Sequence, residues 1–126
     1  MIFKTDTKQT TISKKVSLTG VGLHTGKEVK INFLPAQIND GYKFRRIDLE
    51  GLPMINADAN LVTNTQRGTC LEKNGVIIQT CEHVLAALVG LEIDIVIIEL
   101  KTSEPPIMDG SSKYFIKALE SAGIQV

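Results

Sequence analysis

Apolar and polar residues alternate along the first part of the chain, which is the pattern of half-buried β-strands. Residues 28–33 alternate most cleanly, with Val29, Ile31 and Phe33 on one face. The same reasoning predicts strands over residues 11–21, 42–45, 69–71 and 76–78. Asn39-Asp40-Gly41 and Asn74-Gly75 are strong turn signals. Together these features predict hairpins or a meander.

The hydrophobic period then changes from two to about 3.6, which predicts a helix. Its apolar stripe is Cys81, Val84, Leu85, Leu88 and Leu91, with Thr80 as the expected N-cap. Residues 93–98 are dense in β-branched residues and predict a central strand buried on both faces. A second stripe predicts a final helix, with Ser111 or Ser112 as its cap and Gly123 as its end. This order predicts an α+β fold in two layers, one mostly antiparallel sheet backed by two helices.

Composition narrows the class of protein further. With 126 residues, 43% of them hydrophobic, the chain can form one globular domain over residues 1–126. It has no apolar run long enough to span a membrane and no apolar signal-peptide core near residue 1. Its 14 basic and 14 acidic residues balance, which argues against nucleic-acid binding. Cys70 and Cys81 do not form a CxxC motif, so we expect reduced, buried thiols in a cytoplasmic protein.

A carboxylate and an imidazole stand side by side in Thr80-Cys81-Glu82-His83, at the start of the first predicted helix. Neighbouring side chains on a helix point about 100° apart, so one can bind a metal while the other acts on a water molecule. The simpler interpretation is that Glu82 favours the positive end of the helix dipole and His83 is a boundary residue. A catalytic zinc usually takes three protein ligands, and the only other histidine is His24. The pair therefore indicates half of an active site.

His24 lies in a glycine-rich turn, residues 20–26. It can orient a ligand or merely form a hydrogen bond within the turn, and the residues alone leave both open. The turn is not a phosphate-binding loop, because it lacks the GxxxxGK[ST] pattern and a strand follows it.

Several blocks of the sequence occur in the order found in one enzyme family. They are Val21-Gly-Leu-His-Thr-Gly26, Tyr42 to Arg46, Ala57-Asp58-Ala59, Thr80-Cys-Glu-His83, Ala86-Ala-Leu-Val-Gly-Leu91 and Pro106-Ile-Met-Asp-Gly-Ser111. On these blocks the chain resembles the N-terminal domain of the UDP-3-O-acyl-N-acetylglucosamine deacetylases, zinc amidohydrolases of lipid A synthesis. The resemblance covers roughly residues 8–125.

The resemblance implies a two-domain enzyme with its active site between the domains. His83 would be the single zinc ligand from this domain and Glu82 the general base, while the C-terminal domain, absent here, would supply the other ligands. Fe²⁺ can replace Zn²⁺ in such a donor set. Candidates for binding the UDP-sugar substrate are Leu23, His24, Thr25, Gln66, Arg67 and Gly68. The helix side bearing Ala86, Ala87 and Gly90 would face the partner domain.

Three interpretations from different classes follow. The chain is part of a deacetylase and inactive alone, or it is a binding module that holds a nucleotide-sugar or acyl ligand without turnover. In the third, it is an interaction domain in which Glu82 caps a helix and His83 packs. The matched blocks favour the first, and a His-x-x-x-Asp helix in the sequence that follows residue 126 in the gene would distinguish it from the others.

Overall fold

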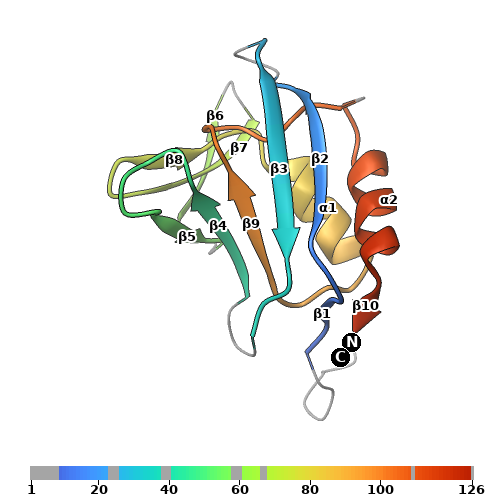
Figure 1. Ribbon diagram of the computed structural model, residues 1–126. Helices are drawn as coiled ribbons and strands as arrows, with labels where there is room; N and C mark the ends of the chain where they lie inside the picture. Colours follow the sequence, from blue (N-terminus) through green and yellow to red (C-terminus); the bar gives the residue numbers. More distant parts are fainter. Residues whose placement is uncertain are drawn as a thin grey trace.

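Five strands form the main sheet, in the spatial order β2-β3-β9-β4-β5 (Figure 1). They are β2 (Val16–Val21), β3 (Glu28–Leu34), β9 (Val96–Leu100), β4 (Tyr42–Arg46) and β5 (Met54–Asn56). Neighbouring strands are antiparallel except β4 and β9, which are parallel. The computed structural model describes residues 9–22, 26–37, 41–57, 61–65, 68–108 and 110–125.

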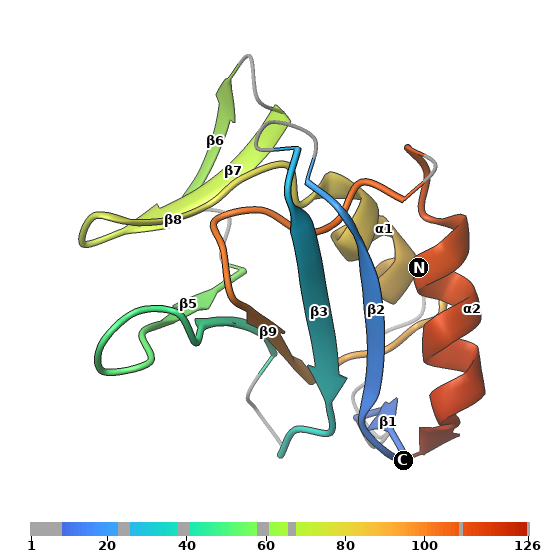
Figure 2. The same cartoon turned by 45° about the horizontal axis from the view of Figure 1, so that its top comes forward.

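Two smaller sheets accompany the main one (Figure 2). One pairs β1 (Thr11–Ile12) with β10 (Ile124–Gln125). The other joins β6 (Val62–Thr65), β7 (Gly68–Lys73) and β8 (Val76–Ile78) in antiparallel order. Between β7 and β8, Asn74 has φ +53° and Gly75 has φ +82°. Positive φ at both central residues is what a two-residue hairpin of this kind requires, so the predicted turn is confirmed.

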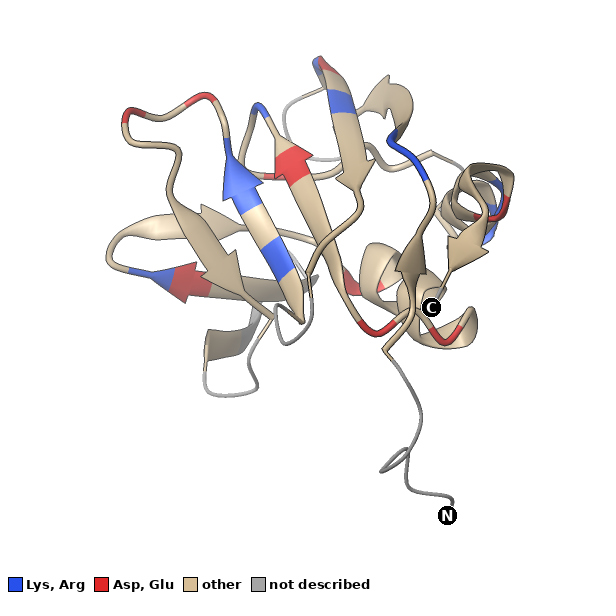
Figure 3. Ribbon diagram, turned by 60° about the horizontal axis from the view of Figure 1, so that its bottom comes forward, with Lys and Arg blue, Asp and Glu red and all other residues tan. Residues whose placement is uncertain are grey.

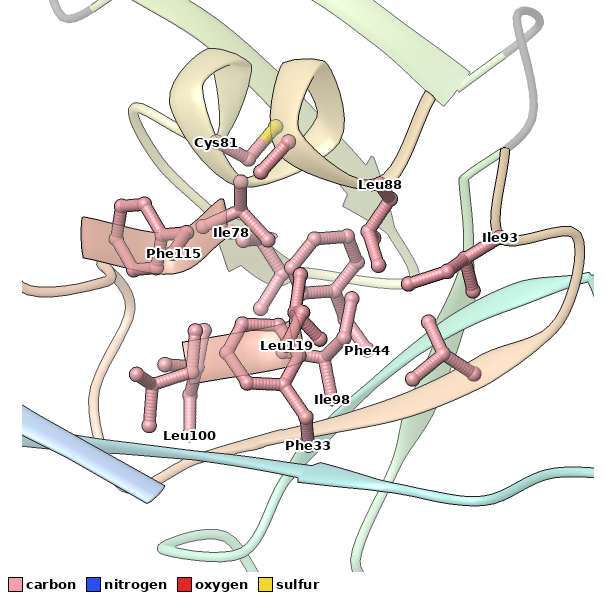
Figure 4. Packing of buried hydrophobic residues seen from close by; sticks show 14 of the residues in the cluster. Phe33, Phe44, Ile78, Cys81, Leu88, Ile93, Ile98, Leu100, Phe115 and Leu119 are labelled. Carbon is pink, nitrogen blue, oxygen red and sulfur yellow. The ribbon is translucent and has the colours of Figure 1, made fainter. Parts of the chain in front are cut away.

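Two helices, α1 (Glu82–Gly90) and α2 (Lys113–Ala122), pack on the same face of the main sheet (Figures 1 and 2). Neither is long and apolar enough to cross a membrane. The core lies between the two layers, where Phe33, Phe44, Leu88 and Phe115 are at most 1% exposed (Figure 4). The rings of Phe33 and Phe115 meet edge to face, 6.3 Å apart at 75°. This arrangement confirms the predicted α+β class.

The outer face of the main sheet is polar, and hydrogen bonds connect four of its strands. Ser17 donates to Asn32 (2.7 Å), Asn32 donates to Glu99 (3.3 Å), and Arg45 donates to Glu99 (3.1 Å). Figure 3 shows basic and acidic residues interspersed on β3, β4 and β9. A face built this way suits contact with water, so only one side of the sheet faces the apolar core.

The central strand differs from the prediction over residues 93–98. It begins at Val96, because the N–H groups of residues 94 and 95 both donate to the carbonyl of Thr10 and are not available to the sheet. The strand is also not buried on both faces. Val96, Ile98 and Leu100 are buried, whereas the residues between them are only partly buried, since they lie on the polar outer face.

The strand predicted over residues 11–21 is interrupted between β1 and β2. The N–H of Ser13 donates to the carbonyl of Gly123 (2.7 Å), which draws this part of the chain toward the end of α2. Gly123 has φ +77° and ends α2 as predicted. At the other end of α2, Ser112 is the N-cap without a side-chain cap bond, while Ser111 Oγ accepts a hydrogen bond from the N–H of Lys113.

A nearly buried arginine fastens the three-stranded sheet to the main one. Arg46 of β4 is 9% exposed and donates from Nε and Nη2 to the two carboxylate oxygens of Asp48, at 2.9 and 2.7 Å. Its Nη1 donates to the carbonyl of Ile77 on β8 (2.9 Å). Because β8 is the hairpin partner of β7, this contact helps to set where β7 meets the helices.

The Arg46–Asp48 pair predicts an acid-dependent loss of stability. The hydrogen bonds from Arg46 hold the pKa of Asp48 below its ordinary value of 3.8, against the opposing effect of burial. A carboxyl with a lowered pKa in the folded state stabilises that state above about pH 4 and loses this contribution as the pH falls through the lowered value. We expect Asp48→Asn to reduce the free energy of unfolding by about 1 kcal/mol at neutral pH, and by progressively less below about pH 4.

Urea denaturation at several pH values measures this difference. Glu50→Gln is the matched control, because Glu50 is an exposed carboxylate in the same segment. A stability difference between wild type and Asp48→Asn that stays constant from neutral pH to about pH 2 would contradict the interpretation.

Candidate active site at the start of α1

The helix that carries Glu82 and His83 begins one residue later than predicted. Cys81 is the N-cap and makes no side-chain cap bond within the helix. Thr80, the predicted cap, has φ +52°, a left-handed conformation that is uncommon for a β-branched residue. The prediction of Thr80 as the cap is therefore wrong, because an N-cap side chain works from an extended backbone.

Strand β7 holds the first turn of α1 through the main chain of Thr69. The carbonyl of Thr69 accepts hydrogen bonds from the N–H of Cys81 (3.0 Å) and from its thiol (3.3 Å). The N–H of Thr69 donates to Glu82 Oε2 across a long contact of 3.4 Å. The residue that orients Glu82 thus comes from the three-stranded sheet. In the sequence Thr69 is simply part of a hairpin strand, and no local signal connects it with Glu82.

The carboxylate of Glu82 has one satisfied and one unsatisfied oxygen. Oε1 is buried and has no hydrogen-bond partner within the described residues, whereas Oε2 receives the N–H of Thr69. A buried polar atom without a partner costs free energy, and such atoms are rare in native proteins. The carboxylate also lies in the first turn of α1, at the positive end of the helix dipole. Within the described residues, Oε1 is therefore the carboxylate oxygen that can still accept a hydrogen bond.

The imidazole of His83 is partly buried, and no hydrogen bond or ion pair engages it within the described residues. It is therefore free to donate a nitrogen lone pair. Within the same residues no three His, Cys, Asp or Glu side chains are grouped to hold a metal ion. A catalytic zinc normally has three protein ligands. His83 and Glu82 would fit one ligand and one base of such a centre, which would need further ligands.

The two cysteines are free thiols and both are buried, as predicted. Burial, with smaller contributions from Glu82 and Cys70, raises the pKa of the Cys81 thiol to about 12. Cys81 therefore stays protonated at neutral pH and acts as a hydrogen-bond donor. A thiol in this state is a poor nucleophile.

Most of the other predicted site residues cannot be placed. Leu23, His24, Thr25, Gln66 and Arg67 lie outside the described residues. Gly68 is the first residue of β7 and directly precedes Thr69. The segment predicted to line the substrate site therefore leads straight into the strand that contacts Glu82.

The exposed side of α1 differs from the predicted one. Ala87 is fully buried in the core, so it does not belong to the outer side. Ala86, Val89 and Gly90 are exposed, and Val89 is 64% exposed. The outer side of α1 is therefore small and apolar, and it follows His83 along the helix.

Fold and site together define an α+β sandwich domain with a carboxylate and an imidazole at the start of its first helix. A family model for LpxC, UDP-3-O-acyl N-acetylglycosamine deacetylase, matches residues 9–126. The UDP-3-O-acyl-N-acetylglucosamine deacetylase of Xanthomonas oryzae pv. oryzae is 50% identical over 94% of this chain and 39% of its own length. The bifunctional enzyme LpxC/FabZ of Bacteroides thetaiotaomicron is 49% identical over 94% of this chain and 26% of its own length. The chain therefore belongs to the UDP-3-O-acyl-N-acetylglucosamine deacetylase family.

These matches also fix how much of such an enzyme the chain represents. It spans about a quarter of the length of the Bacteroides relative and about two fifths of the Xanthomonas relatives that it matches.

Proposed function

We propose that the chain is the N-terminal domain of a zinc-dependent deacetylase that removes the N-acetyl group of UDP-3-O-(3-hydroxyacyl)-N-acetylglucosamine in lipid A biosynthesis. The family match and the names of the relatives support the reaction class. The observation that carries the proposal is the buried Oε1 of Glu82, which has no partner within the described residues and stands beside His83. A buried acceptor without a partner suits a group whose partner arrives with the substrate.

In this proposal Glu82 is the general base. Oε1 takes a proton from the attacking water, the water oxygen bonds to the acetamide carbonyl carbon, and the carbon–nitrogen bond then breaks. Glu82 returns the proton to the departing amine, so that acetate and the free 2-amino sugar are formed. Positioned acid–base groups contribute about 10²–10⁴ in rate.

His83 would hold the metal as the one ligand from this domain. A bound Zn²⁺ acidifies water and polarises a carbonyl oxygen, and Fe²⁺ accepts the same imidazole and carboxylate donors. Imidazole binds such metals in its neutral form, and the side chain of His83 has no competing partner within the described residues. The remaining ligands would come from the C-terminal domain.

The C-terminal domain would lie against the exposed side of α1. Ala86, Val89 and Gly90 lack bulky or charged side chains there, which suits close packing of another element. The loops with Leu23, His24, Thr25, Gln66, Arg67 and Gly68 would contact the substrate. We also propose a cytoplasmic location, because the two cysteines are free thiols as expected in a reducing compartment.

Acetate release from the UDP-sugar substrate tests the proposal. The natural gene product, extended to its stop codon, should release acetate in a metal-dependent manner, and this chain alone should release none. Binding of the substrate without acetate release by the extended protein would instead support a binding module of the same fold. Full activity in this chain alone would mean that every ligand lies within it.

A further inference from the structure

Three hydrogen bonds connect the main chain of Thr69 with the first two residues at the start of α1. Its carbonyl accepts the N–H and the thiol of Cys81, at 3.0 and 3.3 Å. Its N–H reaches Glu82 Oε2 at 3.4 Å. One residue of β7 therefore contacts both the residue that begins the helix and the carboxylate that follows it.

The start of α1 depends on these hydrogen bonds to Thr69, because no N-cap side chain binds the first N–H groups of the helix. Cys81 provides no side-chain cap, and Thr80 before it has a left-handed backbone that costs about 1–2 kcal/mol. Such a conformation persists only where the surrounding structure holds it. Here the chain is held on both sides: the N–H of Gln79 donates to the carbonyl of Ser103 (2.6 Å), and Cys81 is bound to Thr69.

We propose, building on the proposed function, that Cys81 is a positioning residue for the reaction. Its thiol and N–H hold the main chain of Thr69 in place. The N–H of Thr69 then binds Glu82 Oε2, and Oε1 remains to accept the reacting proton. A carboxylate bound at both oxygens would be a poor base, and one bound at neither would rotate freely. Engaging one oxygen defines which lone pairs face the substrate. Catalytic groups displaced by about 1 Å lose on the order of 100-fold in rate, so smaller displacements still matter.

The thiol bond is weak in itself, and its role is geometric. Cys81 is completely buried, and its Sγ lies 3.3 Å from the Thr69 carbonyl oxygen, which accepts the thiol hydrogen. Serine at this position keeps a donor, whereas alanine removes it. Neither Cys81 nor Thr69 would contact the substrate, so a positioning role changes kcat and leaves KM nearly constant.

The test uses the full-length gene product with three variants. Cys81→Ala should lower kcat by about threefold to tenfold with KM unchanged within about twofold, while Cys81→Ser should stay within about twofold of wild type in kcat. Val84→Ala is the matched control, because Val84 is a buried residue of the same helix that takes no part in the hydrogen bonds of Thr69 to Cys81 and Glu82. This variant should lower the thermal midpoint of unfolding. At temperatures below the unfolding transition, its kcat should equal that of wild type.

Hydrogen exchange at the Thr69 amide provides a second readout that does not require activity. Exchange should be faster in Cys81→Ala and in Glu82→Ala than in wild type, and unchanged in Val84→Ala. Equal kcat for Cys81→Ala and wild type, or a Ser variant as slow as the Ala variant, would overturn the proposal. A wild-type enzyme without deacetylase activity would refute the proposed function instead. In that case, unchanged exchange of the Thr69 amide in Cys81→Ala and Glu82→Ala would also refute the proposed link from Cys81 through Thr69 to Glu82.

Discussion

Glu82→Ala in the full-length gene product should lower the kcat of acetate release by about 10²–10⁴. The variant removes the proposed base and leaves the rest of the site in place. Although the substitution lowers kcat, it should not lower the stability of the fold. Because Oε1 of Glu82 is buried and has no partner within the described residues, deleting the carboxylate removes an unfavourable group. The thermal midpoint should therefore be equal to or higher than that of wild type, a trade-off typical of catalytic residues.

Glu120→Ala is the matched control for this variant. Glu120 is an exposed carboxylate on α2, so its removal should change neither kcat nor stability measurably. Glu82→Gln separates charge from shape, since the amide keeps the contact with Thr69 but accepts protons poorly. A Glu82→Gln enzyme with wild-type kcat would exclude Glu82 as the base.

His83→Ala should remove most of the bound metal from the same full-length protein. With one of the expected three ligands gone, the affinity for zinc should fall by more than about 100-fold, since loss of groups that merely support a ligand already costs 10–100-fold. Metal content after dialysis, measured by plasma mass spectrometry, gives this result without an activity assay. Chelation should abolish acetate release by wild type, and added Zn²⁺ should restore it.

His24→Ala is the control for the metal measurement, because it removes the only other histidine of the chain. It should retain the metal and alter KM if His24 contacts the substrate. A His83→Ala protein with the full metal content would contradict the role proposed for His83. Loss of metal in the His24 variant alone would exchange the roles of the two histidines.

The sequence by itself determined the fold class and which residues are candidates for a site. Alternation over residues 28–33 and the change of period at residue 81 gave strands and helices, because these patterns follow from where side chains point in each element. The Asn74-Gly75 turn and the helix end at Gly123 were also predictable, since both need positive φ. The chemistry of adjacent Glu82 and His83 suggested a site, but the roles expected of them came from the resemblance to the deacetylase family.

Tertiary structure decided what depends on contacts between distant segments. The carbonyl of Thr10 displaces the start of β9 to Val96, and the carbonyl of Gly123 interrupts the strand at Ser13. Neither partner is near in the sequence, so no local pattern predicts these changes. The same holds for Glu82, where the main chain of Thr69 binds one carboxylate oxygen, and the other is buried without a partner among the described residues. The sequence shows which chemical groups the chain contains. Only folding brings β7 to the start of α1 and decides which oxygen of Glu82 binds the Thr69 N–H, because hydrogen-bond geometry depends on the folded chain.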